Sequence, residues 1–430
     1  MHQHFRRNLM ALAITAALGG ASGLASAAGF ALIEQSASGM GNAFAGAAAT
    51  AEDASTIFFN PAGLTKLEGR NFAVAGHAIG LSAEFTNNGS STAPAGIATL
   101  GGNGGNAGDT AFVPNAYFSM PLGDRMVLGI GVNAPFGLVT EYDPDWVGRF
   151  QGIKSELKTI NINPTLAYKV NDAVSVGFGV SYQKFDAELT NKVSGAAFGL
   201  PGTEFNAKLE ADDDGFGWNA GVLFQAGPST RIGFSYRSTI DYTLEGDVTI
   251  TDPTGAVVGA ASGAATADIT LPDMFSLSLV HTLNDKIDLL ADVTFTRWSE
   301  IQTIRIINPA TGATRDTLVL NFDDTTRYSI GLNYKFSDRI IGKFGVALDE
   351  SPVSDQDRTV RLPDSDRKWI ALGGSFKVGQ AGKLDLGYAH LFTSESSIDQ
   401  TRGNAAAFGR VAGTYEASID IVSVQYSMSF

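Results

Sequence analysis

The sequence predicts an all-β protein, a transmembrane antiparallel β-barrel of about 14 strands with an N-terminal hatch, or plug, in its lumen. Three observations predict this fold class: an export signal, a strand-like C-terminal end and six regularly spaced short turns. No later stretch reaches the roughly 18 consecutive apolar residues that a membrane helix needs. Only helices and closed barrels satisfy their backbone hydrogen bonds in lipid, so a spanning chain must form a barrel. We expect a signal peptide over 1–27, a hatch over 28–70 and the barrel over 71–430.

The N-terminus has the three parts of a secretory signal. Arg6 and Arg7 supply the positive start, residues 9–18 form the apolar core, and Ala25-Ser26-Ala27 is a small-residue cleavage site. An N-terminal membrane anchor is the alternative, but the apolar core is too short for one. The signal therefore predicts export.

The C-terminal end alternates apolar and polar residues from Val422 to Phe430 and finishes on an aromatic residue. A side-chain period of two indicates a strand with one apolar and one polar face. In an exported chain this ending is typical of the last strand of a barrel in the Gram-negative outer membrane.

Six short turns, rich in Gly, Asn, Asp and Pro, punctuate the chain at 121–125, 170–173, 225–229, 283–286, 337–339 and 379–382. Two strand-like runs joined by a longer loop lie between neighbouring turns. Six turns separate seven hairpins, which predicts fourteen strands with both termini on the periplasmic side.

The predicted strands alternate between an apolar face and a small or polar face, as residues 174–183 do. A secreted β-sandwich would alternate in the same way. Aromatic residues near the short turns, namely Tyr168, Phe224, Phe336 and Phe376, resemble the interfacial girdle of a membrane barrel and favour the barrel.

The composition excludes several classes of function. Charged residues make up 17% of the chain, against about a quarter in soluble proteins, and cysteine is absent, which excludes disulfides and thiolate chemistry. The net charge of −14 argues against a nucleic-acid partner. No Gly-x-Ser-x-Gly motif occurs, and His77, His281 and His390 lack metal-ligand spacing, so we expect no enzyme, metal or cofactor.

Other features concern partners. The acidic run at 210–214 either lies solvated in a loop or bridges cations to lipopolysaccharide. The partners expected of such a barrel are outer-membrane lipid with lipopolysaccharide, and the barrel assembly machinery during insertion. We expect a monomer.

Residues 28–70 lack strand periodicity. Their small-residue run at 36–49 holds Gly39 and Gly41, but no strand precedes these glycines and no Lys-Ser/Thr follows, which argues against a phosphate loop. Asn60-Pro61-Ala62 marks a turn or a helix start. Fourteen strands leave an open lumen, and small residues allow a segment to pack closely inside it.

Several motifs together resemble the FadL-type long-chain fatty acid transporters, a family that includes transporters of toluene and xylene. The motifs are 39–46 (GMGNAFAG), 60–62 (NPA), 136–142 (FGLVTEY), 271–274 (LPDM), 349–353 (DESPV) and 362–369 (LPDSDRKW). The resemblance implies a hatch-closed barrel, a hydrophobic small molecule as the transported partner, and passive uptake. The implied route is capture between outer loops, descent to a lumen pocket, hatch rearrangement and sideways exit through a gap. Phe30 matches a family position near the pocket.

The gap is expected at a kink in the third strand, counted as residues 127–137. Proline cannot donate to a sheet ladder, so Pro135 belongs at an edge or bulge. The expected gap residues are Asn133, Ala134, Pro135, Phe136 and Gly137. The alternative is that Pro135 only ends the strand before an outer loop.

Two outer loops, about 191–214 and 251–265, carry unusually apolar residues and match the family's capture loops. The candidates are Val193, Phe198, Leu200, Phe205, Val257 and Val258. Packing of one loop on another is the alternative interpretation for any single residue.

A fatty acid carboxylate buried in a lumen needs basic partners. Basic residues at the family's pocket positions do not carry over to this chain, but Lys184, Lys192 and Arg327 lie nearby in the sequence. They are either carboxylate partners or ordinary charges paired with neighbouring acids. A neutral aromatic or alkane hydrocarbon substrate therefore remains open, and a general porin is the less favoured alternative.

Overall fold

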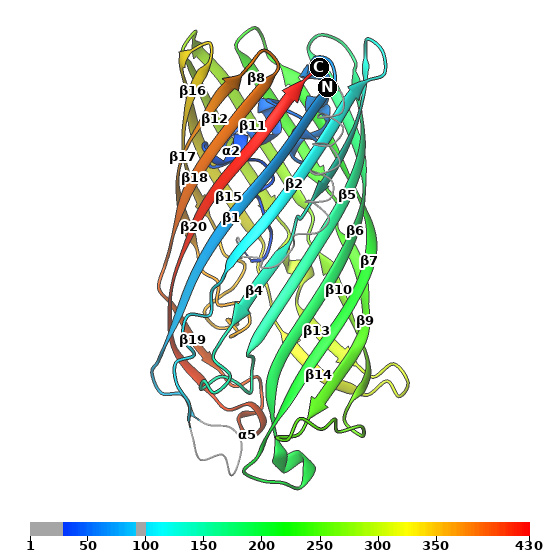
Figure 1. The fold of residues 1–430 in the computed structure, drawn as a ribbon, viewed down its shortest axis with the longest axis vertical. Helices are drawn as coiled ribbons and strands as arrows, with labels where there is room; N and C mark the ends of the chain where they lie inside the picture. Colours follow the sequence, from blue (N-terminus) through cyan, green and yellow to red (C-terminus); the bar gives the residue numbers. More distant parts are fainter. Residues whose placement is uncertain (1–28, 92–99) are drawn as a thin grey trace, which may run out of the picture.

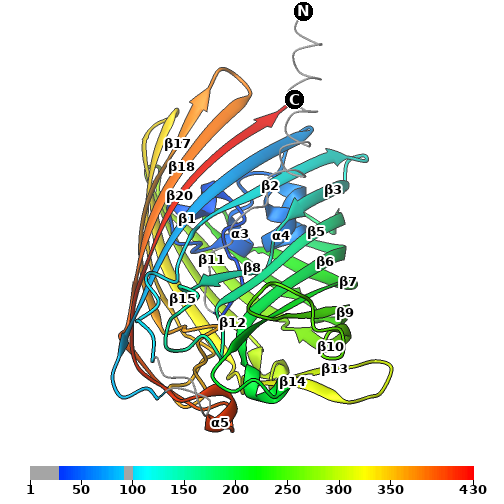
Figure 2. The same cartoon turned by 60° about the horizontal axis from the view of Figure 1, so that its bottom comes forward.

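The computed structural model describes residues 29–91 and 100–430, and shows one closed antiparallel barrel (Figures 1 and 2). Closure is made by β1 and β20, which pair from Asn71 opposite Ser429 to Asn87 opposite Gly413. The predicted signal peptide, 1–27, lies outside the described residues.

Fourteen barrel strands are built from twenty strand segments, because six of the fourteen are interrupted. The segments are β1 (Asn71–Asn87), β2 (Thr110–Pro121), β3 (Met126–Asn133), β4 (Gly137–Glu141), β5 (Lys154–Lys169), β6 (Val174–Ser194), β7 (Glu204–Gln225), β8 (Thr230–Arg237), β9 (Ile240–Thr251), β10 (Gly263–Leu271), β11 (Met274–Asn284), β12 (Ile287–Thr296), β13 (Thr303–Ile307), β14 (Thr314–Val319), β15 (Thr325–Ser337), β16 (Ile340–Asp349), β17 (Arg367–Val378), β18 (Gly382–Thr393), β19 (Ser396–Gln400) and β20 (Val411–Ser429). The interrupted strands are β3/β4, β8/β9, β10/β11, β12/β13, β14/β15 and β18/β19. The predicted fold class and strand number are confirmed.

All six predicted short turns join consecutive strands: β2 to β3, β5 to β6, β7 to β8, β11 to β12, β15 to β16 and β17 to β18. They lie at the end of the barrel that carries the C-terminus, at the top in Figure 1, and the longer loops lie at the opposite end. In outer-membrane barrels the short turns face the periplasm, so the long loops face the outside.

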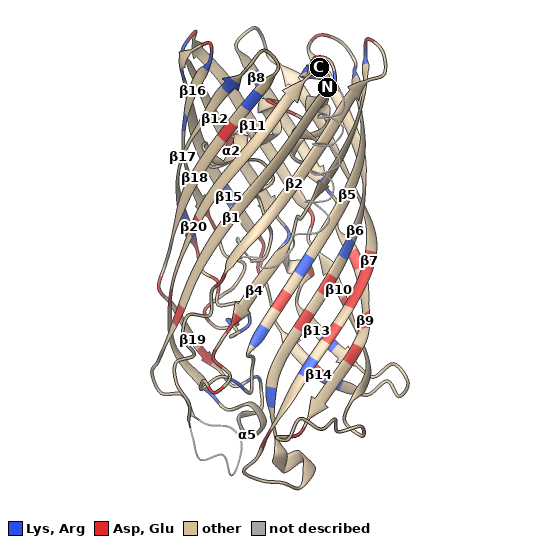
Figure 3. Cartoon of the chain, viewed as in Figure 1, with Lys and Arg blue, Asp and Glu red and all other residues tan. Residues whose placement is uncertain are grey.

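The outer surface divides into an apolar belt and a charged band. Outward residues of β6 are apolar from Val176 to Tyr182 and become charged at Lys184, and β7 changes likewise from Trp218 and Phe216 to Asp214. Figure 3 shows the charged band toward the outer ends of β5, β6, β7 and β9. The apolar belt is the surface that faces lipid.

The plug, defined here as residues 29–70, lies inside the lumen toward the end with the short turns (Figure 2). It contains α2 (Ala37–Met40), α3 (Ala47–Thr50), α4 (Thr56–Phe59) and the 3-10 helix η1 (Pro61–Lys66). Three more short helices, η2 (Gly195–Phe198), η3 (Trp298–Glu300) and α5 (Ala405–Phe408), connect strands. Among the described residues, no helix is long and apolar enough to cross a membrane.

Glycines of the barrel wall let the plug backbone approach the strands. A Cβ added at Gly345 would overlap the backbone of Asn42, and one added at Gly233 would overlap the backbone of Ala48. An added Cβ would also overlap the plug backbone at Gly177 and Gly373, and plug side chains at Gly129, Gly221 and Gly387. These glycines come from β3, β6, β7, β8, β16, β17 and β18. Because they have no side chains, the wall leaves room around the lumen in which the plug fits closely, and we call this surface the glycine seat.

Candidate functional site: two pockets and an interrupted strand

An outer pocket of about 850 Å³ lies within the extracellular part of the barrel. Its lining is almost wholly apolar and comes from eight strand segments, including Phe185, Leu209, Leu244, Ile269 and Ile304. Strand parity explains this, because odd-numbered residues of β6 face the lumen while even-numbered ones face outward. Such a pocket suits a ligand with a large apolar part.

Aromatic rings form a partition at the inner end of this pocket. Phe30 of the plug lies edge to face against Trp298, with ring centroids 4.9 Å apart, and 5.9 Å from the ring of Phe136. Trp298 also contacts Phe322, at 5.9 Å. All four side chains are buried. Phe30 and Phe322 line the outer pocket and Trp298 lines a second pocket, so the rings lie between the two.

The inner pocket, of about 900 Å³, lies between the plug and the wall. The plug contributes Leu32, Phe44, Phe58 and Phe59. The wall contributes Trp298 and a set of polar groups that includes Arg237, Asp292, Thr294, Arg327 and Asp349. The inner pocket is therefore amphipathic, whereas the outer one is apolar.

Two arginine side chains of the inner pocket, Arg237 and Arg327, have guanidinium groups that can donate further hydrogen bonds. Arg327 donates to the carbonyl of Ala43 at 2.7 Å, its Nε lies 4.0 Å from Asp349, and neither Nε nor Nη1 has a hydrogen-bond partner among the described residues. Arg237 donates to Ser181 Oγ at 3.3 Å and to the carbonyl of Phe58 at 3.1 Å, without an ion pair to a described residue. Both groups can bind an anion.

The third barrel strand is interrupted beside the partition. Pairing of β3 with β2 ends at Val132 opposite Ala116, and β4, which resumes at Gly137, pairs with β5 alone among the described segments. The predicted single strand, 127–137, is thus two segments with Pro135 between them, because proline has no N–H for the ladder. Figure 1 shows that β4 does not continue alongside β2.

The N-terminal end of the plug pairs with the interruption. The N–H of Leu32 donates to the carbonyl of Pro135, and the N–H of Gly137 donates to the carbonyl of Phe30, both at 2.8 Å. Gln35 Nε2 donates to the carbonyl of Ala134 at 2.8 Å. The plug therefore supplies bonds that β2 does not make here, and movement of Phe30 would disturb the partition and the interruption together.

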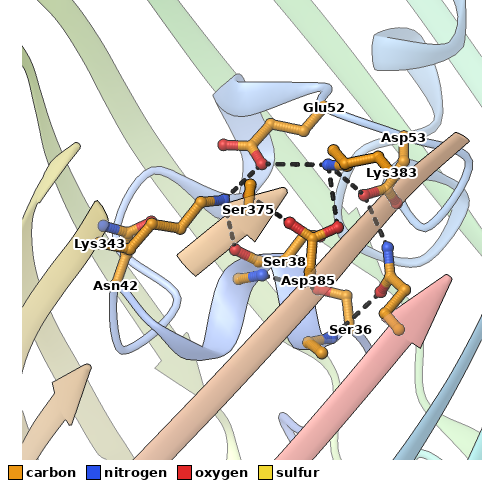
Figure 4. A network of polar contacts seen from close by, with 12 residues as sticks. Ser36, Ser38, Asn42, Glu52, Asp53, Lys343, Ser375, Lys383 and Asp385 are labelled. Atoms are coloured by element: carbon orange, nitrogen blue, oxygen red, sulfur yellow. Dashed lines mark hydrogen bonds and ion pairs between the residues drawn. The ribbon is translucent and has the colours of Figure 1, made fainter. Parts of the chain in front are cut away.

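Charged side chains anchor the plug to the opposite wall (Figure 4). Lys343 of β16 contacts Glu52 at 2.6 Å and the carbonyl of Ser38 at 2.8 Å. Lys383 of β18 lies 3.4 Å from Asp53 and 3.6 Å from Glu52. The network joins the plug to β16 and β18, the two strands that flank β17. It therefore holds this side of the plug, whereas the end that carries Phe30 contacts the strand interruption.

The other predicted hatch residues have structural roles in the plug. Asn60 caps η1, accepting from the N–H of Ala62 at 3.0 Å, and its Nδ2 donates to the carbonyls of Ala48 and Val222. Pro61 begins η1, and Gly41 lies against Gly373. Gly39 lies beside the ring of Phe44.

The gap residues come together at the interruption. Asn133 accepts from Asn161 Nδ2 at 3.0 Å, and Phe136 donates its N–H to Thr159 Oγ1 at 3.0 Å, so both are tied to β5. Ala134, Pro135 and Gly137 bond to the plug, as described above.

The predicted capture residues lie at the outer ends of β6 and β7 and in the loops that follow β6 and β9, and none of them lines either pocket. Phe205 is buried against Phe198, with centroids 4.6 Å apart, whereas Leu200 and Val257 are exposed. Val193 lies near the end of β6, and Val258 follows Val257 in the loop after β9.

The three candidate carboxylate partners lie in different places in the structure. Lys184 lies on the outer surface, paired with Asp186 at 2.7 Å, and Lys192 donates to Asn206 on the same face. Arg327 alone of the three lines a pocket. The alternation of β6 predicts this difference, because its even-numbered residues, such as the two lysines, face outward and its odd-numbered residues, such as Phe185, face the lumen.

Sequence reasoning missed Trp298, Phe185 and Arg237. Inward parity would have pointed to Phe185 and Arg237, since both sit on strands whose alternation is plain. Trp298 lies in η3, within an interruption, where no periodicity is available.

A closed barrel with a lumenal plug, an apolar pocket and an interrupted wall defines an outer-membrane transport protein. Residues 19–430 match the family model described as outer membrane protein transport protein (OMPP1/FadL/TodX), and the chain belongs to this family. Its members are transporters rather than enzymes.

Relatives agree along the whole chain. Outer membrane protein P1 of Haemophilus influenzae is 31% identical, over 90% of each chain. The long-chain fatty acid transport protein of Escherichia coli O157:H7 is 29% identical, over 93% of this chain and 96% of the relative. A crystal structure of a Pseudomonas aeruginosa FadL homologue has the same fold, with a TM-score of 0.87 at 24% identity, covering 94% of this chain and all of that one.

Proposed function

We propose that the protein takes up long-chain fatty acids by passive diffusion. The acyl chain enters the outer pocket, passes the Phe30–Trp298 partition as the plug end moves, and reaches the inner pocket. It then leaves through the interruption at Pro135 into the membrane. The observation that carries this proposal is the pairing of an apolar pocket with an inner one that contains Arg237 and Arg327.

Sideways exit follows from the cost of wetting an acyl chain. Burial of each methylene is worth ~0.8 kcal/mol, so a chain of about 16 carbons gains on the order of 12 kcal/mol on leaving water. Release into the aqueous periplasm would forfeit that gain, whereas release into the bilayer keeps it. The lysine network holds the far side of the plug, which favours movement at its Phe30 end.

A neutral hydrocarbon is the second candidate. Asp292 and Asp349 share the inner pocket with the arginines and supply negative charge there. A pocket whose charges already balance would accept a ligand without a carboxylate. The outer pocket, with its apolar lining, suits either class.

The test is uptake of labelled oleate by cells that lack their own transporter and express this chain, with toluene as competitor. Saturable uptake that toluene barely blocks supports fatty acids. Saturable toluene uptake without oleate uptake, from a correctly folded barrel, contradicts the proposal in favour of hydrocarbons.

The role of the inner arginines is tested separately with Arg237→Met and Arg327→Met. Each should lower oleate uptake about tenfold or more, since a hydrogen bond to a charged group is worth about 1.5–3 kcal/mol. Arg339→Met, in an exposed turn, is the matched control. Uptake that all three variants preserve would remove the arginines from the proposal.

A further inference from the structure

A third cavity opens beside the outer pocket on its extracellular side. It is bordered by the end of β14, by the loop between β16 and β17 and by the segment around Arg402. It shares four residues with the outer pocket: Leu318, Leu320, Thr359 and Arg361. These residues mark the boundary between a polar mouth and an apolar interior.

Arg361 is a buried cation without an acidic partner. It is 7% exposed, and its guanidinium donates to neutral oxygens: the carbonyl of Lys154 at 3.1 Å, Ser155 Oγ at 3.0 Å, and at 3.4 Å the carbonyl of Thr190 and Asn191 Oδ1. Among the described residues no carboxylate lies within ion-pair distance of it, and its Nε has no hydrogen-bond partner.

Its charge persists at neutral pH. Burial and the nearby positive charge of Arg402 lower the pKa of Arg361 to about 10, well above neutrality, although the carboxylate of Asp316, which pairs with Arg402, acts in the opposite direction. A charged group held out of water without a counterion costs several kcal/mol, so the site favours an anion.

Thr359 supplies a second donor at the same boundary. Its Oγ1 is enclosed and has no partner among the described residues, and Thr359 lines both cavities, as Arg361 does. The neighbouring arginines differ, because Arg402 is paired with Asp316 at 2.6 Å and Arg358 is paired with Asp355. Arg361 and Thr359 therefore combine free donors with a position facing the apolar pocket.

We propose that Thr359 and Arg361 bind the carboxylate of an amphiphile whose acyl chain occupies the outer pocket. One carboxylate oxygen accepts from the Thr359 hydroxyl and the other from the Arg361 Nε–H, a charge-assisted pairing. The ligand thus lies with its head at the mouth and its methyl end toward Phe30 and Trp298. This inference deepens the proposed function and rests on it.

Binding of oleate and of its neutral counterpart 1-octadecene is measured on purified full-length barrel in nanodiscs. Arg361→Met should weaken oleate binding about tenfold or more. Thr359→Val, which keeps every Arg361 bond, should weaken it severalfold. Octadecene, which has no carboxylate, should bind both variants as it binds the wild type, which also shows that the pocket is intact. Arg410→Met, an exposed arginine that lines none of these cavities, is the matched control.

The outcomes separate the two proposals. Oleate binding by the wild type that Arg361→Met and Thr359→Val both preserve overturns this inference and leaves fatty acid uptake standing. No oleate binding by a wild-type barrel that binds octadecene overturns the proposed function and the inference together.

Orientation has its own measurement. Stearate brominated near its methyl end should quench Trp298 fluorescence more than stearate brominated near its carboxylate. The share of Trp298 is taken as the difference between the wild type and Trp298→Phe. The opposite order would overturn the tail-first orientation.

Discussion

Phe30 of the plug and Trp298 of the wall meet edge to face, with ring centroids 4.9 Å apart, where the apolar outer pocket ends. Phe30 is also one residue from Ala31, which bridges to Phe136, and its carbonyl accepts the N–H of Gly137. The ring that closes the pocket and the backbone that occupies the strand interruption thus belong to the same residue. A ligand that displaces Phe30 must act on both.

Removal of the Phe30 ring should lengthen the space available to an acyl chain. Phe30→Ala is expected to shift the preference of oleate-type ligands toward longer chains, with about fourfold tighter binding for each methylene that gains room, from ~0.8 kcal/mol. Competition among C12 to C22 acids measures this. Phe336→Ala, at an exposed ring that lines neither pocket, is the control. An unchanged chain-length optimum in Phe30→Ala would contradict the partition.

Restoring an N–H at the interruption should hinder lateral exit. Pro135→Ala allows continued pairing and is expected to slow oleate uptake severalfold without unfolding the barrel. Pro164→Ala is the matched control, since Pro164 lies within β5, where pairing with Ile130 is regular. Uptake is compared at equal amounts of folded barrel. Equal oleate uptake rates for Pro135→Ala and the wild type would contradict lateral exit at the interruption.

The lysine anchors should stabilise the plug. Lys343→Met leaves Glu52 without its closest cation; breaking a buried pair costs roughly 3–5 kcal/mol, and Glu52 is a quarter exposed, so we expect about 2 kcal/mol. Thermal unfolding followed by gel mobility measures the loss, and influx of a bulky hydrophilic dye reports a loosened plug. Lys335→Met, which breaks a more exposed pair with Asp288, is the control. A Lys343→Met barrel as stable and as tight as wild type would show that the pair does not hold the plug.

The glycine seat makes a steric prediction. Gly345→Ala places a Cβ in the backbone of Asn42 and should cost about 1–3 kcal/mol, displacing the plug locally. Gly80→Ala is the control, because its added Cβ would meet only the carbonyl oxygen of Asp420, at 3.8 Å. Labelling of a cysteine introduced at Ser38 measures plug exposure. Equal labelling in both alanine variants would mean that the close fit is not needed.

Local patterns were enough to predict the barrel. The turns at 121–125 and 379–382 and the alternation of residues 174–183 depend on neighbours in the chain, and all appear in the structure as predicted. The interruption near Pro135 is equally local, because a missing N–H acts wherever the strand lies.

The pockets could not be found in this way. Lys184 and Phe185 are adjacent in sequence, yet one faces outside and the other lines the outer pocket. Loop composition drew attention to Val193 and Leu200, whereas the lining comes from inward positions of strands far apart in the chain.

The sequence by itself determined the export signal pattern, the number of strands and the place of the strand break, since each follows from residues close together in the chain. Only the tertiary structure decided that Phe30 meets Trp298, that Lys343 reaches Glu52, and that Arg361 and Thr359 keep free donors at the mouth of an apolar pocket. These relationships join residues brought together by barrel closure and by the seating of the plug, and no short-range pattern records such distances.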